Sequence, residues 1–219
     1  MKKINQNDNH AAQQQNTMQN LMNGKKGRKG LLFVVSGPSG VGKGTLREKL
    51  FKCFQDMVYS VSMTTRAPRI GEKNGIDYYF VSKYVFEQMI KDNSFIEWAI
   101  VHGDYKGTPR EFLRKKLNQG MDTLLEIDVQ GAAQVKKNMP EGIYIFIAPP
   151  SWKDLEHRLR NRKTENKEAV EKRLTDAKTE LKQIEHYDYL IINDNIEVAM
   201  YQLKSIVTAE RCRINVKNI

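Results

Sequence analysis

The sequence predicts an α/β fold, in which a parallel sheet flanked by helices carries a small inserted β-rich lobe. Three observations predict this class. Short apolar runs alternate with helical patterns, as in proteins whose buried parallel strands are joined by helices. One of these runs leads directly into a glycine-rich loop and then a helix. Residues 62–108 break the alternation and are rich in Thr, Tyr and Gly, which favours a separate lobe.

The core strands are predicted from four continuous apolar runs bounded by turn residues. They are Leu31–Val35, Thr123–Ile127, Ile143–Ala148 and Tyr189–Ile192. Helices are predicted where apolar residues recur at helical spacing, namely at Gly44–Cys53, Ala132–Lys137, Ser151–Arg160, Glu168–Ile184 and Ile196–Arg213. Inside the lobe, Asp77–Val81 has the short alternating pattern of a strand. We therefore assign the core to residues 30–61 and 109–210, and the lobe to residues 62–108.

Residues 1–29 are predicted to be a disordered basic extension. Residues 5–23 contain eleven Asn or Gln, and such a segment cannot bury enough apolar surface to offset its ordering entropy. Residues 24–30 read as a flexible basic linker. A solvated extension is the favoured interpretation, and nucleic-acid binding by this basic segment is the alternative that stays open.

Charge and composition limit the classes of partner. The 219 residues carry a formal net charge of +10, and half of it lies in residues 1–29, where six basic residues face one acidic residue. The remainder is only mildly basic, so a small phosphorylated ligand accounts for it and nucleic acid is not required. No apolar run approaches the roughly 20 residues that cross a bilayer, which excludes a membrane span.

The cysteines and histidines indicate a reducing compartment and no metal centre. Cys53 and Cys212 are isolated and form no disulfide framework, and no apolar segment follows the lysines at positions 2 and 3, so we expect a cytosolic protein. The four histidines lack the spacing of metal ligands.

A phosphate-binding loop follows the first strand. The pattern Gly-x-x-x-x-Gly-Lys spans Gly37, Pro38, Ser39, Gly40, Val41, Gly42 and Lys43, and Gly44 and Thr45 follow it. Glycines allow the tight turn and expose backbone N–H groups to phosphate oxygens, and the Lys43 ammonium reaches the β- and γ-phosphates. The position after the lysine usually carries Ser or Thr for Mg²⁺. Gly44 weakens that assignment and leaves Thr45 to contact the phosphates or a metal-bound water.

Several further motifs, in order along the chain, resemble the guanylate kinase family. They are Ser60-Val-Ser-Met-Thr-Thr-Arg66-Ala-Pro-Arg69, Gly71-Glu72, Gly75-x-Asp77-Tyr78-Tyr-Phe80, Phe95-Ile-Glu97-Trp98, Gly103-x-Tyr105-x-Gly107-Thr108, Leu125-Glu-Ile-Asp128-Val-Gln130-Gly131, Phe146-Ile-Ala-Pro-Pro150-Ser151 and Asp188-Tyr-x-Ile-Ile-Asn193-Asp194. The resemblance covers residues 30–210 and leaves only the extension outside. It implies transfer of a phosphoryl group from ATP to GMP, and to dGMP, with Mg²⁺ bound through the ATP phosphates and water.

The resemblance implies a clamp for the GMP phosphate in the lobe. Arg66 and Arg69 correspond to its arginines, which stay charged and grip phosphate bidentately, and Tyr78 adds a hydroxyl donor. Lys106 stands where the family usually has tyrosine. Its ammonium either replaces that hydroxyl or points to solvent. For each arginine, the alternative is a solvated surface residue.

Guanine recognition is implied at four positions. Guanine presents N1–H and N2–H₂ donors beside the O6 acceptor, so its reader needs carboxylates and a hydroxyl. Glu97 and Asp128 correspond to the carboxylates, and Ser62 and Thr108 to the hydroxyls. Glu97 lies in an apolar stretch, so we expect it to have a partner. A structural salt bridge is the alternative.

A helical lid is implied at about residues 158–173. Arg158 and Arg162 are four residues apart on one helical face, and Arg173 follows a polar segment. In the family, such arginines stabilise the transferring phosphoryl group together with Lys43; the alternative is an ordinary basic helix face. Asn193 corresponds to a contact with the adenine edge, or else it merely forms a turn.

Two other function classes are weighed against this enzyme. A non-catalytic interaction module of the same fold lacks the phosphate loop and lid arginines, which this chain keeps. A kinase for another monophosphate would not need both Glu97 and Asp128.

Overall fold

The core of the chain is a five-stranded parallel sheet. The computed structural model describes residues 28–101, 103–161 and 167–214. The core strands are β1 (Leu32–Ser36), β2 (Val58–Tyr59), β7 (Thr123–Glu126), β8 (Ile143–Ala148) and β9 (Tyr189–Ile192). They lie in the order β2-β7-β1-β8-β9, and all four neighbouring pairs are parallel. The predicted parallel sheet is confirmed.

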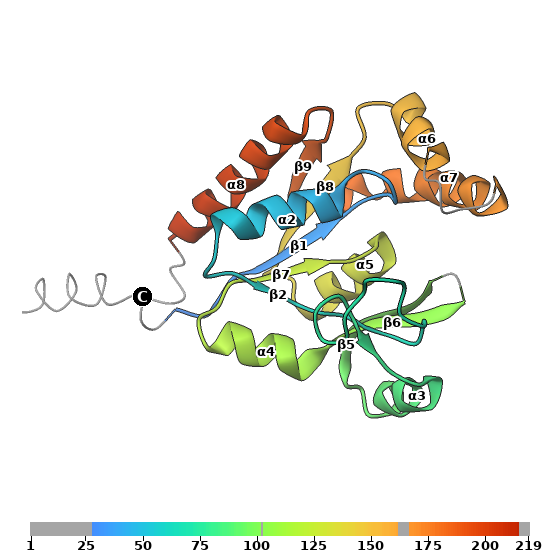
Figure 1. Ribbon diagram of the computed structural model, residues 1–219. Helices are drawn as coiled ribbons and strands as arrows, with labels where there is room; N and C mark the ends of the chain where they lie inside the picture. Colours follow the sequence, from blue (N-terminus) through green and yellow to red (C-terminus); the bar gives the residue numbers. More distant parts are fainter. Residues whose placement is uncertain (1–27, 102, 162–166, 215–219) are drawn as a thin grey trace, which may run out of the picture.

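Helices cover both faces of this sheet (Figure 1). They are α2 (Lys43–Cys53), α4 (Arg110–Asn118), α5 (Val129–Asn138), α6 (Trp152–Arg160), α7 (Lys167–Leu181) and α8 (Ile196–Cys212), with a short 3₁₀ turn, η1, at Ile184–His186. α2 and α8 lie on one face, and α4 and α5 on the other. The described helices α6 and α7 lie beyond the carboxyl ends of the strands.

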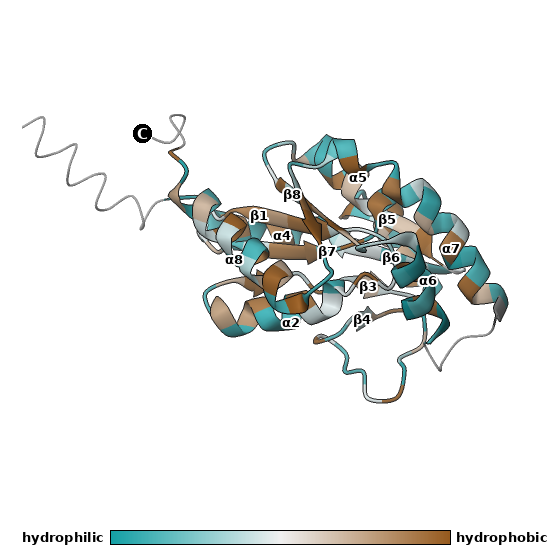
Figure 2. Ribbon diagram, turned by 90° about the horizontal axis from the view of Figure 1, so that it is seen from above, coloured by the Kyte–Doolittle hydropathy of each residue, from teal (hydrophilic) through white to brown (hydrophobic). Residues whose placement is uncertain are grey.

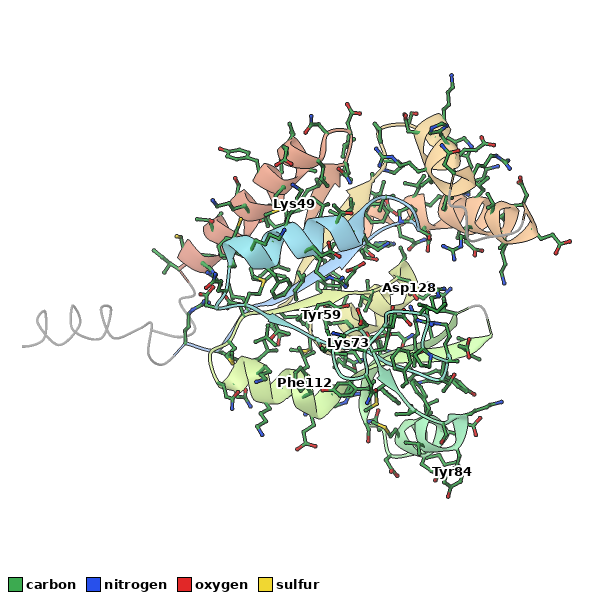
Figure 3. All side chains as sticks on the ribbon, in the orientation of Figure 1. Lys49, Tyr59, Lys73, Tyr84, Phe112 and Asp128 are labelled. Carbon is green, nitrogen blue, oxygen red and sulfur yellow. The ribbon has the colours of Figure 1, made fainter. Side chains whose placement is uncertain are left out.

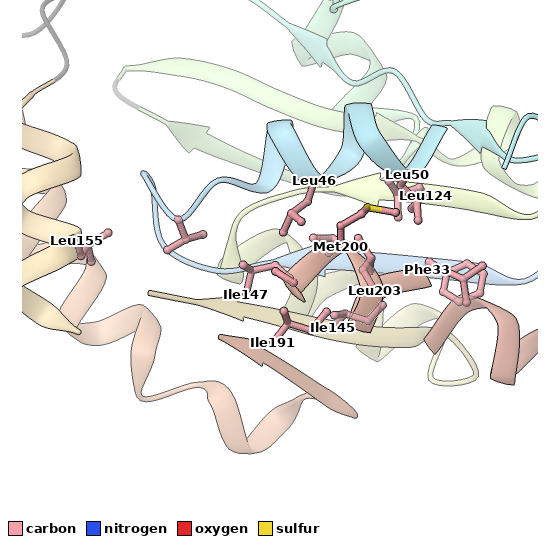
Figure 4. Packing of buried hydrophobic residues seen from close by; sticks show 14 of the residues in the cluster. Phe33, Leu46, Leu50, Leu124, Ile145, Ile147, Leu155, Ile191, Met200 and Leu203 are labelled. Carbon is pink, nitrogen blue, oxygen red and sulfur yellow. The ribbon is translucent and has the colours of Figure 1, made fainter. Parts of the chain in front are cut away.

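Alternate residues of the central strand face opposite helix layers, which explains the continuous apolar run. Phe33 packs with Leu46 of α2 and Leu203 of α8 in one cluster (Figure 4). Val34 packs with Leu113 of α4 in the other cluster. Full burial of such side chains contributes about 1.5–3 kcal/mol each. In the hydropathy colouring the strands are largely brown, while the exposed helix faces are mostly teal (Figure 2).

The inserted segment forms a second, four-stranded sheet. Its strands are β3 (Met63–Thr64), β4 (Tyr79–Phe80), β5 (Phe95–Val101) and β6 (Asp104–Pro109), in the order β4-β3-β6-β5. The predicted β-rich lobe is confirmed, but it also contains a helix, α3 (Lys83–Lys91), that the sequence reading missed. Phe86 is its one buried residue and stacks on Phe95 and Tyr105, with ring centroids 4.3 and 5.1 Å away.

Arg28, which belongs to the extension predicted for residues 1–29, contacts the core. The Arg28 guanidinium donates to Asp122 Oδ2 at 2.9 Å, and the Asp122 side chain is almost fully buried. The same carboxylate accepts from Leu31 N at 2.8 Å and from Arg211 Nε at 2.8 Å. Arg28 is therefore held by charge rather than by apolar surface. Within the described part of the chain, none of the helices is both long and apolar enough to span a bilayer.

Candidate active site

The glycine-rich loop joins β1 to α2 and has a shape that requires glycine. Gly37, Gly40 and Gly42 have φ angles of 138°, 88° and 91°, which side-chain-bearing residues rarely adopt. A Cβ on Gly37 would lie 2.1 Å from the backbone oxygen of Ile147. The loop thus lies against β8, at the carboxyl edge where α/β sheets bind ligands.

Lys43 is folded onto this loop. Its Nζ donates to the backbone oxygens of Gly37 at 2.5 Å and Pro38 at 3.0 Å. Glu180, on α7, experiences the charges of both Lys43 and Asp128. Burial raises the pKa of Glu180 to about 6, and the Lys43 charge opposes that rise. Glu180 therefore lies within electrostatic reach of the loop and of the predicted guanine site.

Two of the three lid arginines are anchored beside the loop. Arg173 of α7 donates from NH1 to Ser39 Oγ at 2.7 Å. Arg158 of α6 donates from NH2 to the backbone oxygen of Asn193 at 3.0 Å. Both guanidinium groups are therefore held close to the phosphate-binding loop. Arg162, the third, lies outside the described residues.

The Asn193 side chain holds the phosphate-binding loop by a hydrogen bond to its backbone. It is buried, and Nδ2 donates to the Val41 backbone oxygen at 2.7 Å. A Cβ on Gly42 would lie 2.5 Å from this nitrogen. The side chain is thus a structural contact of the loop, and its Oδ1 is the atom left for the predicted contact with adenine.

In the small lobe, Arg66 is oriented by an acidic partner. Its NH2 donates to both carboxylate oxygens of Glu72, at 2.8 and 3.0 Å. The Arg69 backbone N–H donates to the same carboxylate at 2.7 Å. These contacts, with the Arg66 side chain first, hold the pKa of Glu72 below its usual range. Glu72 therefore fixes the turn that carries both predicted phosphate-binding arginines.

The Lys106 side chain points towards Tyr78, beside the Arg66 guanidinium. Its Nζ donates to the Tyr78 hydroxyl at 3.0 Å and lies 4.8 Å from the centroid of the Tyr78 ring. The Arg66 guanidinium carbon lies 5.5 Å from the same ring centroid. Two cations thus flank Tyr78, which is the arrangement expected of an anion site.

Two carboxylates, the buried Glu97 and the half-buried Asp128, lie between the lobe and the core. Thr108 Oγ1 donates to Glu97 Oε1 at 2.6 Å, so the expected partner of Glu97 is confirmed. Asp128 caps α5 by accepting from Gly131 N at 2.8 Å. A Cβ on Gly131 would lie 2.8 Å from Glu97 Oε2 and 3.6 Å from Asp128 Oδ1, so glycine leaves room for both carboxylates. In Figure 3, Asp128 lies where the lobe faces the core.

Burial makes Glu97 an unusual acid. Only 5% of the residue is exposed, and desolvation raises its pKa to about 7, against the Thr108 hydrogen bond and the Lys106 charge, which lower it. The Asp128 charge raises it further. Ser62, the other predicted hydroxyl contact, is 8% exposed at the start of the lobe. A ligand rich in hydrogen-bond donors would stabilise these carboxylates.

Glu126 ends β7, beside the loop strand, with Val35 as its register partner. A Cβ on Gly44 would lie 3.9 Å from Glu126 Oε1. The other oxygen, Oε2, is buried and lies 3.2 Å from Arg47 NH1, yet it accepts no hydrogen bond of good geometry from the described residues. Thr45, the residue after Gly44, lies in the first turn of α2.

The sequence analysis assigned no site role to Glu72, Glu126 or Glu180. Glu180 carried one usable signal, because it lies seven residues after Arg173 and therefore shares its helix face. Glu72 belongs to the Gly71-Glu72 motif, but its contact with Arg66 depends on the turn between the two residues.

Comparison with known proteins identifies what this arrangement resembles. The guanylate kinase family matches residues 29–210. A guanylate kinase from Syntrophomonas wolfei is 48% identical over 192 residues, covering 88% of this chain and 98% of its own, and one from Bacillus anthracis is 50% identical over 190 residues, covering 86% and 92%. The crystal structure of guanylate kinase from Anaplasma phagocytophilum superposes with a TM-score of 0.71 at 37% identity, covering 85% of this chain and 88% of that one.

Proposed function

Since this chain belongs to the guanylate kinase family and phosphorylates GMP to GDP with ATP, we propose that ATP binds at Gly37–Thr45 and GMP binds in the small lobe. The observation that carries this proposal is the pair of carboxylates formed by the buried Glu97 and the half-buried Asp128. Two carboxylates in one pocket favour a base edge with adjacent N–H donors, and guanine N1–H and N2–H₂ supply them. Ser62 and Thr108 would complete the contacts to the base.

The cations of the lobe match the charge of a nucleoside monophosphate. Arg66, Arg69 and Lys106 contribute three positive charges, and Glu72 removes one. The net charge of +2 balances the charge of about −2 on a phosphate dianion. With Tyr78 as a further donor, this clamp would hold the accepting phosphate in place.

The ATP side supplies the charge that the reaction needs. Lys43 would leave the Gly37 and Pro38 oxygens for phosphate oxygens, which are stronger, charged acceptors. Arg158 and Arg173, with Arg162, would stabilise the transferring phosphoryl group in a loose, in-line transition state. A general base is not required, because the GMP phosphate is already anionic. Exclusion of water on closure would limit ATP hydrolysis.

The residues beside the loop fit a magnesium ion brought by ATP. Glu126 presents Oε1 beside Gly44, while its Oε2 faces Arg47, and carboxylate oxygen is a ligand that Mg²⁺ prefers. Among the described residues no group of three or more acidic, His or Cys side chains could hold a metal, so the phosphates and water would supply the other ligands. Glu126 and Thr45 would hold the ion, which neutralises phosphate charge when bound.

Two finer features complete the proposal. dGMP would also be accepted, because none of the residues assigned here is assigned to the ribose 2′-hydroxyl. The reaction would take place in the cytosol, since Cys53 and Cys212 are both free thiols, as expected of a reducing compartment.

Steady-state kinetics test the division of roles. Arg173→Ala is expected to lower kcat by roughly 10³-fold with little change in KM for GMP. Arg66→Ala is expected to raise KM for GMP more than it lowers kcat. If both variants change the same parameter by the same factor, the two half-sites are wrongly assigned.

A further inference from the structure

Strand β5, which carries Glu97, is an open edge of the small sheet. In the order β4-β3-β6-β5 it pairs with β6 alone, so its outer backbone groups have no strand neighbour in the described sheet. A bulge between Phe95 and Glu97 also shifts its register against β6. Bulges bend a strand and re-aim its side chains, and here Phe95, Ile96 and Glu97 are buried in succession. The position of the Glu97 carboxylate therefore depends on what holds this edge.

One side chain of α5 takes the place of the missing strand. Gln134 Nε2 donates to the backbone oxygen of Trp98 at 2.8 Å, and Gln134 Oε1 accepts from the Trp98 backbone N–H at 3.2 Å. A single amide thus makes the pair of hydrogen bonds that a residue of an antiparallel strand would make with Trp98. One turn further along α5, Asn138 Nδ2 donates to the Ile96 backbone oxygen at 3.0 Å. The residues on both sides of Glu97 are therefore bonded to α5.

The same helix carries the second carboxylate of the predicted guanine site. Asp128 caps its first turn, and Gly131 leaves room for Glu97 Oε2. Gly131, Gln134 and Asn138 are three and four residues apart, which is the spacing of one helix face. Helix α5 thus presents Asp128 at one end and binds the Glu97 strand along its side. Because α5 packs in the core, the two Gln134 hydrogen bonds join the lobe to the core.

We propose that Gln134 is a positioning residue for base selection: its amide fixes the backbone of Trp98 so that the Glu97 carboxylate stays beside Asp128. This inference rests on the proposed function, in which both carboxylates receive the donors of guanine. A slip of an edge strand turns its side chains away from the face that they occupy, and a contact made by two hydrogen bonds resists that motion. Gln134 is assigned no contact with base or phosphate, so its effect passes through Glu97.

The test is a double-mutant cycle on the full chain with Gln134→Met, Glu97→Gln and both together. Methionine is an unbranched helix former that cannot reproduce the pair of hydrogen bonds. Gln134→Asn is a second variant, because it keeps the amide but is shorter by one carbon–carbon bond, about 1.5 Å. The matched control is Gln202→Met, at an exposed glutamine of α8. For each protein, kcat and the KM values for GMP and ATP are measured.

Gln134→Met is expected to raise KM for GMP by about tenfold, since two neutral hydrogen bonds are lost, while KM for ATP stays within about twofold. Gln134→Asn should behave alike, and Gln202→Met should match the parent. In the Glu97→Gln background, Gln134→Met should raise KM for GMP by less than about twofold, because the carboxylate that it positions is gone. Amide hydrogen exchange gives a direct readout: the Trp98 N–H should exchange about tenfold faster in Gln134→Met than in the parent.

Three results would overturn the proposal: KM for GMP within twofold of the parent in both Gln134 variants, an equal rise in KM for ATP, or effects that multiply fully in the double variant. A loss of stability without the difference between the two KM values would count as the first of these. An unchanged KM for GMP in Glu97→Gln would instead refute the proposed guanine site. A rise in Glu97→Gln with none in Gln134→Met overturns this inference alone.

Discussion

Replacing Glu97 with glutamine should make the free protein more stable and a poorer GMP binder. The carboxyl is buried with a pKa of about 7, against an ordinary value of 4.5. The unfolded chain therefore loses this proton at a lower pH than the folded chain does. Glu97 therefore does not lower the free energy of unfolding below pH 4.5. Its destabilising effect grows as the pH rises towards 7 and is largest above pH 7.

The magnitude follows from this pKa difference. The ionised Glu97 lowers the free energy of unfolding by at most about 3 kcal/mol above pH 7. Glutamine has no charge to desolvate, its oxygen can still accept from Thr108, and its amide can donate towards Asp128. We expect Glu97→Gln to raise Tm by roughly 5–10 °C at pH 8 and by little at pH 5.

The assay is thermal unfolding at pH 5, 6.5 and 8, with Glu48→Gln as an exposed control. In the same variant, KM for GMP should rise by about 10²-fold, because an amide N–H would face guanine donors. The parent's KM should also fall between pH 6 and 8 more steeply than the variant's. The phosphate of GMP titrates in both enzymes, so the difference reports Glu97. A lower Tm of the variant at pH 8, or a gain in Tm that does not depend on pH, would show that the buried Glu97 charge does not destabilise the protein.

Three further predictions follow from other contacts. Lys106→Tyr should keep kcat within a few-fold but flatten the rise of KM for GMP with salt, because it removes a screened charge; parallel salt dependences would show that Lys106 does not touch the phosphate. Arg28→Ala should cost about 1 kcal/mol in chemical denaturation, with Lys29→Ala as control; equal stabilities would mean that the Asp122 pair contributes nothing. Lys43→Ala should fold normally, by circular dichroism, yet lose about 10³-fold in kcat; turnover within tenfold of the parent would contradict its role.

The core was predictable because its signals are local. Continuous apolar strands and the loop motif each occupy a few adjacent residues, and the observed β1 and β8 match the predicted runs to within one residue. Helix α3 was missed although Phe86, Met89 and Ile90 recur at helical spacing and Ser82 caps its first turn, because it is a short helix inside a segment interpreted as β-rich. Helix α5 begins three residues earlier than predicted because the Asp128 side chain caps it, and α7 ends at Leu181, three residues before its predicted end.

The site was predictable in its residue types and less so in their contacts. The burial of Glu97 followed from its apolar neighbours, and the need for a partner followed from burial. In contrast, the contact of Arg173 with Ser39 joins residues 134 apart, and that of Arg28 with Asp122 joins residues 94 apart. Such pairs form only in the assembled fold, so no local sequence pattern predicts them.

A panel of nucleoside monophosphates shows whether the acceptor site of this chain selects guanine. Formation of ADP from ATP would be followed with GMP, dGMP, AMP, CMP and UMP as acceptors, at equal enzyme concentration. We predict that kcat/KM for GMP exceeds that for AMP by about 10⁴-fold, because adenine would leave Glu97 and Asp128 without donors. A ratio within tenfold, or a preference for CMP or UMP, would show that Glu97 and Asp128 do not select the base.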